Sequence, residues 1–231
     1  MQIPDRVSPQ VLATIILLAV LAPFVWRVVK RLGALLFLRA AVRGALSDIG
    51  RKALERQPDT IHLELTKNPQ WKNAAAMEAL AGPLRNKGFQ DCGVFTVDKM
   101  PDVKVWILCQ EQTWVAAHLY EHPKAGIWPE LVTRYTNGAS HSITTKPATG
   151  IHMPDWISII RSLEAPTDQL YERLLDERSQ VGIEHVSRAE AAHAFEAAYS
   201  RQMIAMKNAG ISPQEVAAVI KKWAERKMAG A

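Results

Sequence analysis

The sequence contains little cysteine: Cys92 and Cys109 are the only two among 231 residues. Two cysteines cannot build the disulfide framework of a small secreted domain, and these two are too far apart in the chain for the closely spaced ligand pairs of a structural zinc site. Free thiols are typical of a reducing compartment. We therefore predict no metal site and no cofactor.

The sequence also lacks the short motifs of the common enzyme classes. It has no P-loop, no Rossmann fingerprint, no nucleophile elbow, no kinase motif set and no metalloprotease HExxH. We find no internal repeat, no low-complexity tract and no lipidation motif. These absences exclude the common enzymes but leave room for an enzyme with an unfamiliar site.

Net positive charge is missing from most of the chain, although the whole chain carries +5. Residues 27–56 contain eight Lys or Arg and two acidic residues, so this segment alone holds +6. Because Asp5 and Arg6 cancel, residues 58–231 carry the remaining −1. Nucleic-acid-binding domains normally present a basic surface, so we do not expect a nucleic-acid partner.

What the chain does have is a long hydrophobic run. Residues 7–26 contain no charged side chain, and roughly 20 helical residues are enough to cross a hydrocarbon core about 30 Å thick. A buried core helix of this length would normally have a polar face. A cleaved signal peptide would carry its basic residues before the run, whereas here they follow it. We predict a single transmembrane anchor over residues 1–31.

The basic residues after the run indicate how the anchor is oriented. Lys and Arg are retained on the cytoplasmic side, so we predict the N-terminus outside and the rest of the chain in the cytoplasm. The candidate membrane-surface residues are Arg27, Lys30, Arg31, Arg39, Arg43, Arg51 and Lys52. Residues 32–57 also have apolar residues at helical spacing. This amphipathic helix can lie on the membrane, continue the anchor or pack on the following domain.

Residues 58–231 have the length of one domain. Alternating apolar and polar residues predict a strand over 61–66, and Asn68 with Pro69 predicts the start of a helix that Gly88 ends. Strand-like runs separated by short turns then predict an antiparallel meander. These runs are residues 92–97, 103–110, 113–121, 128–136 and 139–146. The predicted fold class is α+β, with about five or six strands packed between flanking helices.

Turn residues suggest how these strands pair. Asn137-Gly138 is typical of a two-residue hairpin, and further turns are placed at residues 100–101 and 111–112. The predicted pairs include Thr133 with Ser142, Cys92 with Cys109, Val94 with Ile107, Thr96 with Val105, and Val105 with His118. The two cysteines then become cross-strand neighbours, either as inert buried thiols or as a redox pair. Both faces of this sheet are apolar at its centre, so each needs a covering layer.

The C-terminal part of the chain is predicted to be helical. Residues 153–162 fit a helix or a strand equally well, and residues 166–178 form an amphipathic helix. Ser187 with Glu190 and Ser212 with Glu215 have the spacing of capping boxes, which start helices. Gly210 separates these last two helices.

Histidines supply the first candidate site. Four of the seven, His118, His122, His141 and His152, lie within 35 residues. On a helix, His118 and His122 could share a metal ion, but on the predicted strand they share one face and Glu121 points to the other. The candidate catalytic residues are His118, His122 and His141. The alternative, which we favour, is ordinary histidines on the surface of the sheet.

Hydroxyl side chains supply the second candidate. Residues 136–149 are rich in Ser and Thr and include Lys146, a composition that can bind an anion. The segment lacks a glycine-rich loop before a helix, which is the usual phosphate site. An exposed hairpin at the edge of the sheet is the simpler interpretation.

Two functional hypotheses remain. The first is a membrane-anchored cytosolic interaction or accessory module, which acts at the inner face of the membrane with another protein as its partner. The second is an enzyme of unfamiliar type that uses His118, His122 and His141. The arrangement of these histidines distinguishes the two hypotheses, because an enzyme needs the three imidazoles together in one cavity.

Overall fold

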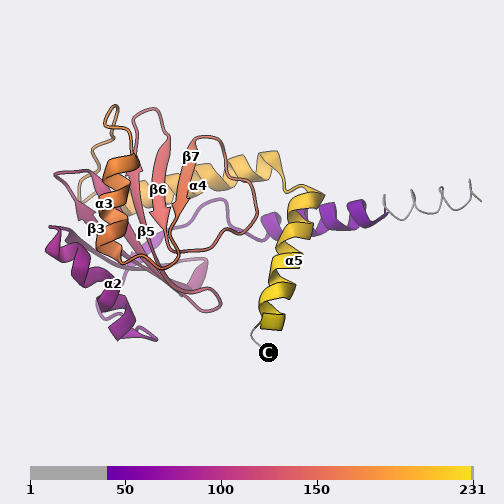
Figure 1. Ribbon diagram of the computed structural model, residues 1–231, viewed down its shortest axis with the longest axis horizontal. Helices are drawn as coiled ribbons and strands as arrows, with labels where there is room; N and C mark the ends of the chain where they lie inside the picture. The colour runs from indigo at the N-terminus through magenta and orange to yellow at the C-terminus, as the bar shows by residue number, and fades with distance from the viewer. Residues whose placement is uncertain (1–40, 230–231) are drawn as a thin grey trace, which may run out of the picture.

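A computed structural model of the chain describes residues 41–229 (Figure 1). The predicted span over residues 7–26 lies outside the described residues, as do Arg27, Lys30, Arg31 and Arg39. From residue 41 to residue 229, no helix combines the length and the apolar composition needed to cross a membrane.

The domain is α+β and is built on one sheet of seven strands that follow one another in chain order. All neighbouring strands are antiparallel except β6 and β7, which are parallel. The strands are β1 (Leu63–Leu65), β2 (Gln90–Val97), β3 (Met100–Gln110), β4 (Val115–His122), β5 (Gly126–Arg134), β6 (Ser140–Thr144) and β7 (Ile157–Arg161). The helices are residues 41–55, α2 (Ala74–Asn86), α3 (Thr167–Glu177), α4 (Ala191–Ala209) and α5 (Pro213–Ala229). The predicted meander is thus confirmed, with one more strand than expected.

Helices cover both faces of the sheet, as its apolar centre requires (Figure 1). α2 and α3 pack on one face against Leu108, Leu119 and neighbouring side chains, which are fully buried. α4 packs on the other face against Val105 and Ile107. Because successive side chains of a strand point to opposite faces, the unbroken apolar run of β3 contributes to both cores.

The predicted register of the β2–β3 hairpin is wrong by one residue. Val94 pairs with Trp106 and Thr96 with Lys104. The chain turns at residues 98–99 rather than 100–101, and an irregularity between Thr96 and Val97 offsets most of that shift. A shift of one residue exchanges the faces of a strand. Val94 therefore packs on the α2 side, while Phe95 and Val97 belong to the α4 side.

The predicted cross-strand pair of cysteines is also corrected. Cys109 pairs with Gln90, and Cys92 lies at a β-bulge between Asp91 and Gly93. A bulge inserts one unpaired residue and tilts its side chain out of the regular alternation. Both thiols are free, and a hydrogen bond from the Cys109 thiol lowers the pKa of Cys92. The two side chains are therefore close despite the wrong register.

The other two hairpins also differ from the predicted register. Ile107 pairs with His118, two residues away from the prediction, because the turn is longer and ends at Trp114 with φ of 55°. Thr133 pairs with His141 rather than Ser142, because a loop over residues 135–139 replaces the two-residue turn. The first shift preserves the faces of the strand, and the second exchanges them.

The four predicted signals for helix ends have different outcomes. The predicted cap Asn68 is wrong, since Asn73 caps α2 by accepting a hydrogen bond from the Ala76 amide at 3.0 Å. Gly88 does end this helix region, with φ of 84°. The Ser212 and Glu215 side chains form the predicted capping box at α5. Ser187 bonds to Glu190 in the same way, but one turn before α4, which begins at Ala191.

The ambiguous residues 153–162 contain a strand, β7, that pairs with β6. The predicted exposed edge hairpin over residues 136–149 is therefore wrong, because β6 lies inside the sheet. Parallel neighbours need a connection that crosses back over the sheet. Here residues 145–156 make that crossover without any helix.

The described part of the basic helix, residues 41–55, packs partly on the domain. Leu54 is buried, and Gly50 lies against Ile211 and Val216 at the start of α5. Arg51 and Lys52 form ion pairs with acidic residues of the same helix. The C-terminal turns of this helix thus pack on the domain, which is one of the three arrangements considered for it.

Candidate ligand-binding cavity

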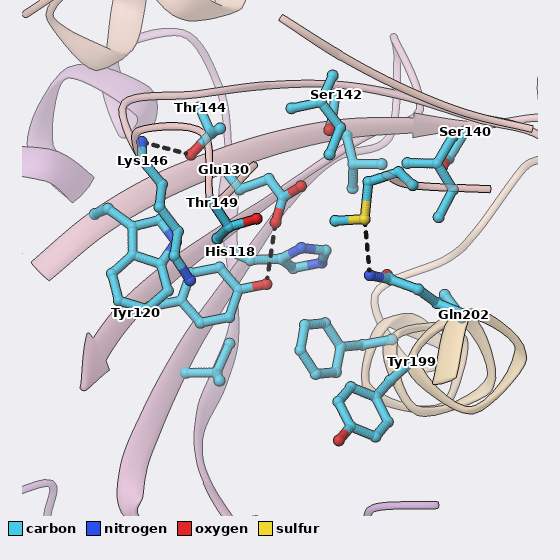
Figure 2. Close-up of a pocket in the computed structure, with 18 of the residues that line it drawn as sticks. His118, Tyr120, Glu130, Ser140, Ser142, Thr144, Lys146, Thr149, Tyr199 and Gln202 are labelled. Atoms are coloured by element: carbon cyan, nitrogen blue, oxygen red, sulfur yellow. Dashed lines mark hydrogen bonds between the residues drawn. The ribbon is translucent and has the colours of Figure 1, made fainter. Parts of the chain in front are cut away.

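A cavity of about 320 Å³ lies on the α4 side of the sheet. Its floor is formed by strands β2 to β7, one wall by α4 and the rim by the crossover of residues 145–156. Figure 2 shows Ser140, Ser142 and Thr144 along β6, facing Tyr199 and Gln202 on α4. The volume falls in the range of small-molecule sites, about 300–1,000 Å³.

Aromatic side chains form much of the cavity lining. Tyr120 and Trp128 stack with ring centroids 4.8 Å apart, and Phe195 meets the His118 ring edge-on at 4.8 Å. The Lys146 ammonium lies 4.0 Å from the centroid of Trp128. One aromatic face in the cavity therefore already has a cation of this chain against it.

Strand pairing brings polar residues of the cavity into one row. His118 on β4 lies opposite Glu130 on β5, which lies opposite Thr144 on β6. The Tyr120 hydroxyl donates a hydrogen bond to Glu130 at 3.3 Å (Figure 2). Thr144 donates to the Pro129 carbonyl at 2.7 Å. Glu130 and Thr144 thus have partners within the protein.

Several other polar side chains of the cavity have none among the described residues, including the buried Tyr199 hydroxyl. Within residues 41–229, no hydrogen bond or ion pair reaches the Arg134 guanidinium, and burial lowers its pKa. Ser142 is 2% exposed and its Oγ is without a partner. His118 makes no hydrogen bond to the described residues, and burial lowers its pKa to about 3, so its imidazole is neutral. A buried polar group without a partner costs about 1–3 kcal/mol.

Cations outnumber anions around the cavity. Arg134, Lys146 and Arg161 line it, against the single carboxylate of Glu130. Burial lowers the pKa of Lys146, which Glu130 partly offsets. The cavity therefore favours negative charge in anything that enters it.

Contacts with two helices hold the crossover over the cavity. The Gln202 amide donates to the Met153 sulfur at 3.6 Å (Figure 2), and the Arg201 guanidinium lies 4.1 Å from the centroid of Trp156. At the far end, the His152 amide donates to Glu215 of α5 at 2.6 Å. These contacts fix the rim without a single apolar core residue.

The candidate histidines do not converge. His118 is buried in the cavity rather than on the sheet surface, which corrects the interpretation favoured above for this residue. His122 ends β4, where its Nδ1 accepts the amides of Lys124 and Ala125. His141 lies on the α3 face with its Nε2 sealed and unpartnered, and His152 is exposed. In the part of the chain that the structure describes, no cluster of three or more His, Cys, Asp or Glu could hold a metal ion.

Sequence reasoning found part of this cavity and missed the rest. For the Ser- and Thr-rich run with Lys146, an exposed hairpin was preferred to an anion site, yet Ser140, Ser142, Thr144 and Lys146 line the cavity. Arg134 and Glu130 were missed, because on an alternating strand their facing depends on the register. The signal available was a charged pair at positions i and i+4 of a predicted strand, which places both on one face.

Comparison with protein-family models, with curated proteins and with solved structures found no match to this chain. The cavity therefore has to be interpreted from its own geometry and chemistry.

Proposed function

We propose that this chain is a membrane-tethered binding module that takes up a small organic molecule in the α4-side cavity. The observation that carries this proposal is the combination of aromatic walls with buried polar groups that lack partners. Apolar walls with a few convergent polar groups are the usual composition of ligand sites. A bound molecule would give Arg134 and His118 hydrogen-bond partners that the described residues do not supply.

The tether and its orientation follow from the sequence. The charge-free run over residues 7–26 and the basic residues after it support a single-pass anchor with the domain on the cytoplasmic side. A domain held there meets ligands at the inner face of the membrane. A protein partner that recognises the loaded domain would make it the accessory module proposed above.

The observations support binding better than they support catalysis by His118, His122 and His141. His118, with a pKa of about 3, is a weak base near neutral pH, whereas an efficient general base has a pKa near the working pH. His122 and His141 lie outside the cavity. No observation within residues 41–229 favours a reaction over simple binding.

The test is the binding of 5-fluoroindole, a neutral aromatic probe, to the full-length chain in lipid nanodiscs. Binding is followed by ¹⁹F NMR, with empty nanodiscs as the control for partition into lipid. Ala198 lines the cavity on α4, and its neighbour Ala197 is exposed. We expect the wild-type chain and Ala197→Trp to bind the probe and Ala198→Trp, which fills the cavity, to lose at least tenfold in affinity. Equal binding by the two variants, or none by the wild type, would refute the proposal.

A further inference from the structure

Arg134 is the feature of the cavity that most restricts its occupant. The guanidinium carries five N–H donors. Its side chain is half-buried and lines the cavity, and no hydrogen bond or ion pair to residues 41–229 reaches it. Glu130 and Glu184 act on it through their charge alone, and Glu130 accepts a hydrogen bond from Tyr120. The N–H donors of Arg134 are therefore available to an acceptor that enters the cavity.

A cationic occupant fits poorly. Cation recognition uses open aromatic faces, but Lys146 already lies against Trp128 and Arg201 against Trp156. A ligand cation would also be repelled by Arg134. A neutral occupant fills the space but gives the guanidinium no charged acceptor for its hydrogen bonds.

We propose, building on the binding role above, that the ligand is a small organic monocarboxylate whose carboxylate accepts hydrogen bonds from Arg134. The planar guanidinium fork matches a carboxylate with two parallel hydrogen bonds. Arg134 on β5 and Ser140, its partner on the adjacent β6, face the cavity side of the sheet. The apolar body of the ligand lies along the aromatic wall to which Tyr120 and Phe195 belong.

The cavity also limits the size of this carboxylate. Its volume is about 320 Å³, and a water molecule in the liquid takes up about 30 Å³. The space therefore holds a ligand of roughly ten non-hydrogen atoms. A phenyl ring on a short aliphatic acid has this size, whereas a long-chain fatty acid would have to leave most of its chain outside.

The experiment compares three probes of nearly identical shape and different charge. 4-Phenylbutyrate, 4-phenylbutyramide and 4-phenylbutylamine each compete with 5-fluoroindole for the full-length chain in nanodiscs, with displacement read by ¹⁹F NMR. A hydrogen-bonded ion pair is worth about tenfold or more in affinity. We expect the acid to bind at least tenfold more tightly than the amide and the amine to bind most weakly. Equal displacement by acid and amide, or a preference for the amine, would overturn the inference.

Two arginine variants test which cation produces the preference for the acid over the amide. Arg134→Gln is expected to bring the acid and the amide to within threefold of each other while 5-fluoroindole still binds, which shows that the cavity is intact. Arg161→Gln, which removes an exposed cation from the same cavity, keeps the tenfold preference. A preference that survives Arg134→Gln and disappears in Arg161→Gln would place the anion at the mouth and contradict the inference.

The outcomes for this inference and for the proposed function are distinct. If 5-fluoroindole binds the wild-type chain but the acid has no advantage, the cavity is a binding site and the carboxylate inference fails alone. If 5-fluoroindole does not bind, the binding role itself fails. If Arg134→Gln loses the probe through misfolding, Arg134→Lys, which keeps the charge without the fork, should retain the probe and lose most of the preference for the acid.

Discussion

The two faces of the sheet differ in whether their charged side chains have hydrogen-bond partners within the protein. On the α2 face, Glu121 is 3% exposed and accepts hydrogen bonds from the Lys72 amide at 2.8 Å and the Lys104 ammonium at 3.2 Å. On the α4 face, the half-buried Arg134 has no such partner among the described residues. We attribute this difference to the binding role proposed for the α4-side cavity.

The covering layers explain this difference. Two helices, α2 and α3, pack on the first face, and its central side chains, such as Leu108 and Leu131, are fully buried. The second face has α4 alone, which leaves β5 and β6 partly to the crossover of residues 145–156. A loop has fewer apolar side chains to pack than a helix, so space remains beneath it.

The largest expected effect is on the free energy of unfolding when Glu121 and Arg134 are replaced one at a time. Breaking a buried, hydrogen-bonded ion pair costs about 3–5 kcal/mol, so Glu121→Leu should lower the free energy of unfolding by about that amount. Arg134→Met should leave it unchanged or raise it, because no partner is lost. Urea unfolding of the full-length protein in nanodiscs, monitored by tryptophan fluorescence, measures both. Similar losses for the two variants would show that Arg134 is a structural charge after all.

The next effect is the pH dependence that arises from His118. An unfolded histidine has a pKa near 6.5, and in the folded protein burial lowers the pKa of His118 to about 3. Between these values the unfolded chain binds a proton that the folded chain does not, so stability falls as the pH decreases. The loss is at most about 1.4 kcal/mol per pH unit, and stability is complete above pH 6.5.

Two phenylalanine variants isolate this contribution. His118→Phe keeps a ring against Phe195 and should make unfolding less sensitive to pH between about 6.5 and 4. His193→Phe, which changes an exposed histidine of α4, should leave the wild-type slope. Parallel slopes for wild type and His118→Phe would contradict a buried neutral imidazole.

The smallest expected effect is a gain in stability. Ser142 has a sealed hydroxyl without a partner, so Ser142→Ala should stabilise the unliganded protein by about 1 kcal/mol. For a domain of this size, that raises the melting temperature by about 2–4 °C. Thr144→Val, which removes a hydroxyl bonded to Pro129, should lower it. If Ser142→Ala also lowers the melting temperature, the hydroxyl contributes to folding.

Local signals in the sequence were sufficient to predict where the helices and strands lie. They were insufficient to predict which side chains lie on which face of the sheet. Alternation and turns located six of the seven strands, and the Ser212 capping box located the start of α5, because these features depend on neighbouring residues. The register depends on turn length, which Met100-Pro101 and Asn137-Gly138 suggested incorrectly. Both faces of β3 are apolar, so hydrophobic pattern could not correct the error.

The candidate site was harder to predict for the same reason. The pairing of Arg134 with Ser140 rather than with a neighbouring residue decides which polar side chains meet across β5 and β6. A one-residue error there moves Ser142 from one face to the other. The absence of a partner for Arg134 is a tertiary property, since it depends on what α4 and the crossover do not supply.

The crossover of residues 145–156 has a consequence for the timing of exchange. It is fastened to α4 by a Met153 sulfur and a Trp156 ring rather than by packed apolar core, so it can lift while the sheet remains folded. Loops of this kind move on timescales of nanoseconds to microseconds, far faster than global unfolding. The opening of this crossover would then limit both the entry and the exit of a ligand, independently of its binding affinity. Loosening Gln202 would shorten the residence time and speed entry together, and leave occupancy at equilibrium nearly unchanged.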